Sequence, residues 1–127
     1  MRAERSFPPA SSSVRAARHF ATDALAELDD ETLEVVALMV SELATNSVRH
    51  ARTGFRVEVE QEEGRVRVSV VDGDETEPRR RVPERGEPTG RGLLIVDRFS
   101  DRWGVEVEHG EKRVWFAVRA PAVANRT

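Results

Sequence analysis

Apolar side chains in the first 51 residues recur every three or four positions, which predicts two helices. In the first helix, which follows a run of serines able to cap it, one face carries small or apolar residues at positions 14, 17, 21, 24 and 28. The second helix is expected over residues 31–51, and its first half is apolar nearly all round, as in a buried helix. Residues 1–10 contain Pro8 and Pro9 and are predicted to form an irregular lead-in.

The hydrophobic period then changes to two, with valines alternating with charged residues. This alternation predicts two hairpins, whose four strands cover residues 55–60, 65–70, 103–108 and 113–119. A short helix is expected over residues 92–99, between the hairpins. Helices followed by hairpins indicate an α+β fold, a two-layer sandwich in which one face of a mainly antiparallel sheet lies under helices and the other faces water.

Residues 75–91 form a long polar connection between the hairpins. A connection of this length inside a compact domain is usually a functional lid or a disordered segment. Its five arginines are Arg79, Arg80, Arg81, Arg85 and Arg91. These arginines either form a solvated face or attract a phosphate-bearing or acidic partner. The tail from residue 121 is expected to be frayed.

Composition excludes several classes of protein. A chain of 127 residues is the length of one domain, and its net charge of −3 argues against direct binding of nucleic acid, which favours a basic surface. The absence of cysteine excludes disulfides, a thiolate zinc site and a cysteine nucleophile. Its apolar stretches are far too short to span a membrane, and no secretory signal is evident. We therefore expect a cytoplasmic protein.

Three polar residues interrupt the buried helix. Glu42, Asn46 and His50 lie four residues apart and therefore share one side of it. Burying each of them without a polar partner would cost about 1–3 kcal/mol. Either the last turns of the helix leave the core and enter solvent, or this stripe faces a polar cavity.

Two further segments are candidates for binding. Asp72 ends a strand of valines and precedes Gly73. This pattern fits an ordinary aspartate at the end of a strand, and it also fits a binding residue. Gly90 and Gly92 flank Arg91 where a helix is expected to start, and such glycines allow an anion to approach the exposed N–H groups. A flexible loop end would give the same pattern.

In combination these segments resemble a known family. Glu-Leu-Ala-Thr-Asn-Ser-Val-Arg-His-Ala, from Glu42 to Ala51, resembles the N-box of the GHKL superfamily of ATP-binding domains (gyrase, Hsp90, histidine kinases and MutL). Asp72 is similar to the aspartate of its G1 box, and Gly-Arg-Gly-Leu-Leu-Ile-Val at residues 90–96 to its G2 box. Over residues 12–118 the chain most resembles the stand-alone bacterial anti-sigma-factor serine/threonine kinases.

The resemblance implies the Bergerat fold and binding of ATP or ADP with Mg²⁺. It implies that Asn46 ligates the metal and that Glu42 is the general base toward a serine hydroxyl. It further implies that Asp72 accepts from the adenine amino group, while Gly90 and Gly92 approach the phosphates. The other residues expected beside the nucleotide are His50, Gly73, Arg91 and Leu93. Residues 75–91 would form the ATP lid.

The activity implied is phosphorylation of a STAS-domain anti-sigma antagonist, and a sigma factor is a second candidate partner. Homodimers are common in that subgroup, so another copy of the chain is a third. The G1 box departs from the family's Asp-x-Gly-x-Gly, because its only glycine, Gly73, comes one position early. Lys112 and Arg113 stand where the family often has Gly-Thr. These departures leave open an alternative, a degenerate member that holds nucleotide poorly and works by docking a partner.

Overall fold

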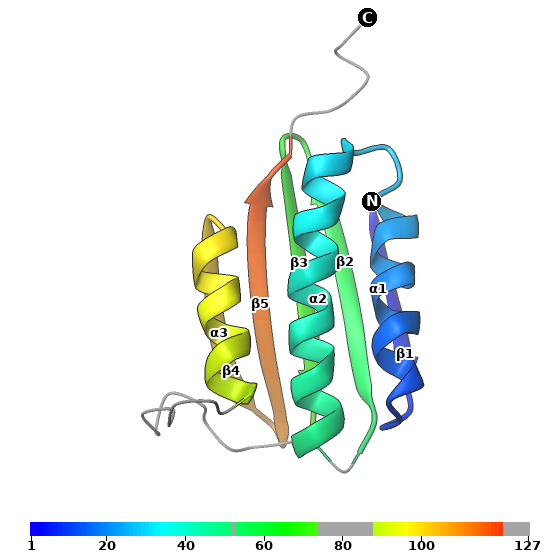
Figure 1. Ribbon diagram of the computed structural model, residues 1–127, viewed down its shortest axis with the longest axis vertical. Helices are drawn as coiled ribbons and strands as arrows, with labels where there is room; N and C mark the ends of the chain where they lie inside the picture. Colours follow the sequence, from blue (N-terminus) through cyan, green and yellow to red (C-terminus); the bar gives the residue numbers. More distant parts are fainter. Residues whose placement is uncertain (52, 74–87, 121–127) are drawn as a thin grey trace, which may run out of the picture.

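The computed structural model describes residues 1–51, 53–73 and 88–120. The elements in chain order are β1 (Arg2–Phe7), α1 (Ser12–Ala24), α2 (Asp30–His50), β2 (Phe55–Glu62), β3 (Arg65–Asp72), α3 (Pro88–Phe99), β4 (Arg102–Glu108) and β5 (Glu111–Arg119). The strands form one sheet in the order β1-β2-β3-β5-β4, and every neighbouring pair is antiparallel. All three helices lie on one face of this sheet (Figure 1). The predicted α+β two-layer sandwich is confirmed.

The core lies between the helices and the inward side of the sheet. Alternation along β2, β3 and β5 places valines inward, and the register pairs Val57 with Val70 and Val68 with Phe116. These side chains meet Val36 and other apolar residues of α2, all of them buried. Because full burial of one such side chain is worth about 1.5–3 kcal/mol, this layer supplies most of the driving force for folding.

The central helix, α2, has signals at both ends. The Asp29 carboxylate accepts a 2.9 Å hydrogen bond from the Thr32 N–H, and acidic residues occupy the first turn. Arg49 and His50 lie in the last turn, where positive charge complements the helix dipole. Between these ends the helix is largely buried against the sheet. Among the described residues, no helix combines the length and apolar composition that crossing a bilayer needs.

The prediction of an irregular lead-in was wrong, because residues Arg2–Phe7 form the edge strand β1. It pairs with β2 along its length, so backbone hydrogen bonds supply the order that its own mixed sequence does not signal. Phe7 anchors its end, with its ring stacked on Phe55 at 5.4 Å and edge-on to Phe20 at 6.1 Å. Pro8 follows the strand and does not disrupt it.

Two helix boundaries also differ from prediction. Helix α1 ends at Ala24, four residues early, and a turn continues to residue 28. Helix α3 begins at Pro88, not at residue 92, because proline is well tolerated in a first turn whose N–H groups have no helical partner. Residues 88–91 of the predicted lid therefore belong to a helix. The rest of that lid, 75–87, and the predicted tail, 121–127, lie outside the described residues.

The open face of the sheet is charged and carries an ion network around Glu58. This carboxylate is 7% exposed and accepts hydrogen bonds from Arg56, at 2.7 Å, and from Arg113. Arg56 lies also 3.4 Å from Glu4 and 3.6 Å from Glu111, so the network joins strands β1, β2 and β5. Burial alone would raise the pKa of Glu58, but the two guanidinium groups outweigh it and lower that pKa.

Candidate functional site

A small cavity of about 20 Å³ lies on the helix side of the sheet, enclosed by α2, α3, β3 and β5. Its lining residues are Leu43, Asn46, Ser47, Val70, Asp72, Leu93, Lys112 and Val114. Three of the residues singled out in the sequence, Asn46, Asp72 and Leu93, thus meet at one place although they come from three elements. Such a volume holds about one water molecule.

Asn46 is the unusual residue of this cavity. It is 8% exposed, and its Oδ1 atom is buried with no hydrogen-bond partner in residues 1–51, 53–73 and 88–120. A buried acceptor left unpaired costs about 1–3 kcal/mol, so its presence calls for an explanation. At Asn46 the polar stripe of α2 therefore faces a polar cavity. At its end the other interpretation holds, because His50 is exposed.

Gly92 allows α3 to lie directly against Asn46. A Cβ atom at position 92 would stand 2.5 Å from Asn46 Nδ2, a separation at which something must shift. Gly92 itself is buried. The predicted approach of an anion to this glycine stays a prediction. The group approached in this structure is the side chain of Asn46.

Asp72 is buried at the end of β3, with 4% of its surface exposed. Its Oδ2 accepts a 2.6 Å hydrogen bond from the hydroxyl of Ser47, itself 3% exposed. Ser47 follows Asn46 directly, so adjacent residues of α2 serve the two polar positions of the cavity. Sequence reasoning did not select Ser47, although its position directly after Asn46 in the helix could have indicated that it lies in the same site.

Lys112 is the second polar lining residue that was not selected as part of the site. It pairs directly with Asp72 in the β3–β5 register and is only 7% exposed. It has the same parity as Val114 and Phe116, which point inward from β5. That parity could have placed it in the core, and its side chain on the wall of the cavity.

Among the other predicted residues whose side chains the structure describes, Glu42, His50 and Gly73 are not part of the cavity lining. Glu42 is half-buried, one helical turn before Asn46, and Gly73 is exposed after β3. Gly90 and Arg91 belong to the first turn of α3 by their backbone. The predicted roles of all four stay predictions, as does that of His50.

The pattern of the histidine kinase-like ATPase domain family matches residues 7–118, and the chain belongs to this family. The fold is similar to that in the crystal structure of the RsbU and RsbW domains of Rv1364c from Mycobacterium tuberculosis, with a TM-score of 0.73 and 20% identity. The similarity covers 96% of this chain and 34% of that one, so the chain spans about a third of its length. No curated protein matches the sequence. The GHKL resemblance and its fold are confirmed.

The donor set of the site fits a magnesium–nucleotide complex. Among the described residues, no cluster of three or more histidine, cysteine, aspartate or glutamate side chains is arranged to hold a metal ion. Mg²⁺ does not need such a cluster, because it is commonly held by one or two protein oxygens, substrate phosphates and water. The unpaired amide oxygen of Asn46 is a neutral ligand of this kind.

Proposed function

We propose that this domain binds ATP or ADP together with Mg²⁺ in the space between α2, the end of β3 and the start of α3. The observation that carries the proposal is the buried Oδ1 of Asn46 beside Gly92, which has no partner among the described residues, in a chain of the histidine kinase-like ATPase family. A metal ion would give this acceptor its missing partner. Within the same cavity, Asp72 offers a carboxylate to the amino group of adenine.

Different residues of the chain would recognise the base and assist phosphate transfer. Ser47 holds the Asp72 carboxylate in place through its 2.6 Å hydrogen bond, which orients the other oxygen. Glu42 lies one turn before Asn46 on α2, where it could accept the proton of a serine hydroxyl as that oxygen attacks the γ-phosphorus of ATP and ADP leaves. When bound, Mg²⁺ supplies charge neutralisation for the phosphates. The product would be a phosphoserine or phosphothreonine on the partner.

A purine does not fit a cavity of about 20 Å³, so binding requires the walls to move apart. Leu93 and Lys112 line it from α3 and β5, and both are side chains with rotamer freedom. Gly92 of α3 lies directly against the Asn46 side chain, which makes this contact a natural place for separation.

We further propose that the protein is an anti-sigma-factor-type serine/threonine kinase acting on a STAS-domain antagonist, with a sigma factor as a second partner. Family membership and the similarity to the fold of a structure containing an RsbW domain support this choice. One observation favours the rival function, a docking module without catalysis. Lys112 is buried in the wall of the cavity beside Asp72, where a nucleotide would otherwise contact the strand.

Calorimetric titration with ATP and ADP, with and without Mg²⁺, tests the binding site. We expect saturable binding that Mg²⁺ strengthens and that Asp72→Asn weakens more for adenine than for guanine nucleotides. Arg15→Gln, an exposed change on α1, is the control and should titrate like the parent. Absence of binding at millimolar nucleotide would reject the site in favour of the docking module.

Incubation with radiolabelled ATP and a purified STAS-domain protein tests the kinase. Glu42→Ala should retain nucleotide binding and lose phosphotransfer, because only the proposed base is removed. Transfer by Glu42→Ala at the parental rate would show that the base is misassigned. A complex with the STAS partner that forms without phosphate transfer and ignores ATP would support the docking module.

A further inference from the structure

The open face of the sheet, opposite the helices, carries a cluster of arginines. Strand alternation brings them outward from β3, β4 and β5, and they are Arg65, Arg67, Arg102 and Arg119. The register pairs Arg65 with Arg119, and Ala117 lies between Arg67 and Arg102. By register, the four arginine positions therefore lie around one small residue near the β2–β3 turn. In a chain of net charge −3, this is a local reversal of sign.

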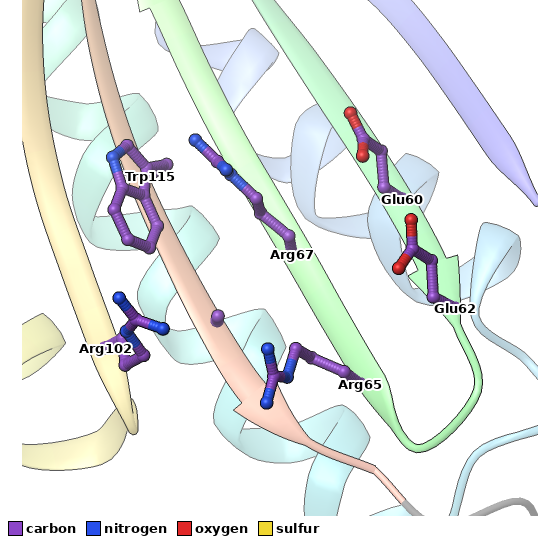
Figure 2. A pocket seen from close by; sticks show the side chains of 7 residues that line it. Glu60, Glu62, Arg65, Arg67, Arg102 and Trp115 are labelled. Carbon is purple, nitrogen blue, oxygen red and sulfur yellow. The ribbon is translucent and has the colours of Figure 1, made fainter.

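The cluster borders a hollow of about 320 Å³ (Figure 2). Its lining residues are Glu60, Glu62, Arg65, Arg67, Arg102, Trp115 and Ala117. The hollow is many times larger than the cavity at Asn46 and lies on the other side of the sheet. It has room for one or two amino-acid side chains of a partner.

The indole of Trp115 forms an apolar wall of this hollow. Arg67 stacks over its ring, with Cζ 4.3 Å from the centroid. On the neighbouring strand, Gly104 pairs with Trp115, and a Cβ there would stand 2.8 Å from the indole Nε1. Glycine at this position lets the ring lie across β4, half-exposed.

The arginines of this cluster are not neutralised as their neighbours are. Arg56 and Arg113, further along the same face, both bond to the buried Glu58. By contrast, Arg65 and Arg102 form no ion pair within the described chain, and Arg67 reaches only Glu106, at 3.9 Å. Figure 2 shows the Arg65 guanidinium extending away from Glu62 toward Arg102. Two cations that face one hollow repel each other until an anion lies between them.

We propose that this hollow is a docking site for an acidic segment of a partner protein, with a carboxylate between Arg65 and Arg102. Arginine suits this role because its planar fork binds carboxylates with paired hydrogen bonds. The adjacent Trp115 supplies the apolar contact that such anchors commonly use. Glu60 and Glu62 on the opposite wall repel the carboxylates of the segment from β2 and so direct them toward Arg65 and Arg102.

Fluorescence anisotropy of a fluorescein-labelled octaglutamate peptide tests the proposal with the full chain. Binding should be saturable, weaken with added salt, and fall about tenfold or more in the double variant Arg65→Gln/Arg102→Gln. The matched control is Arg15→Gln/Arg98→Gln, which removes the same charge from exposed positions of the helix layer. This control should bind like the parent. An octaglutamine peptide should not bind.

Four results would overturn it. The first is the absence of saturable binding of the acidic peptide. The second is an equal loss of peptide affinity in both double variants, which would reflect net charge alone. The third is an equally tight complex with a single-stranded DNA oligonucleotide that needs the same two arginines. The fourth is a self-association, seen by sedimentation, that Arg65→Gln/Arg102→Gln abolishes, because the face would then be occupied by a second copy. Circular dichroism of each variant establishes that it is folded.

Discussion

The Ser47 hydroxyl donates a 2.6 Å hydrogen bond to Oδ2 of Asp72, and both residues are almost completely buried. This bond joins the last turns of α2 to the end of β3. The two bonded residues lie 25 positions apart in the sequence. It gives an inward carboxylate a local donor inside a largely apolar layer. It also sets the distance between the helix that carries Asn46 and the strand that carries Asp72.

Replacing Ser47 with alanine should lower the free energy of unfolding by about 1–3 kcal/mol, since the buried carboxylate loses a donor. Urea denaturation measures this change. Ser12→Ala, at an exposed position in the first turn of α1, is the control and should change stability by about 0.5 kcal/mol or less. Equal effects of the two substitutions would show that the bond contributes little.

Asn46→Ala should change nucleotide binding while leaving the stability of the fold nearly unchanged. Because Oδ1 has no partner within the described residues, its loss should leave the free energy of unfolding within about 1 kcal/mol of the parent. The same change should abolish the Mg²⁺-dependent part of nucleotide binding, measured by calorimetry. Thr45→Ala, which removes a hydroxyl that donates to the Ser41 carbonyl at 2.7 Å, should keep that part. An unaltered Mg²⁺ dependence in Asn46→Ala would remove the proposed ligand.

Gly92→Ala should lower the free energy of unfolding by about 1–3 kcal/mol, as overpacking of a close contact does. The added methyl would lie 2.5 Å from Asn46 Nδ2 and push α3 away from α2. Thermal unfolding gives the magnitude. Leu94→Ala, on the same helix but 71% exposed, serves for comparison and should cost much less. A neutral Gly92→Ala would mean that α3 yields at this contact without penalty.

Stability should fall with acid through Glu58. Its pKa is lowered in the folded protein, so its carboxylate stabilises the fold above the unfolded pKa of about 4.3. This contribution is lost as the pH drops through the folded value. Glu58→Gln should therefore flatten the decline of unfolding free energy below about pH 4, whereas Glu63→Gln in the exposed β2–β3 turn should not. Parallel curves for the parent and Glu58→Gln would contradict the assignment.

The helices and hairpins followed from local patterns, because apolar period and turn residues act within a few positions of the chain. The alternating valines of β2 and β3 were sufficient to predict both strands and the face that each buries. Strand β1 was not predictable in this way, since its order comes from pairing with β2, more than 45 residues away. Phe7 was the single strong apolar signal within it.

The sequence by itself determined the fold class and the order of Glu42, Asn46, Asp72 and Gly92 along the chain. Tertiary structure decided which of these residues meet, because burial and unpaired atoms arise only when α2, α3 and the sheet pack together. It separated Asn46, whose buried oxygen has no partner in the described part of the chain, from His50, exposed on the same helix stripe. It also brought Ser47 and Lys112 to Asp72 and gathered Arg65 and Arg102 around one hollow. Such contacts depend on the packing of the helix on the sheet and on strand register, not on spacing in sequence.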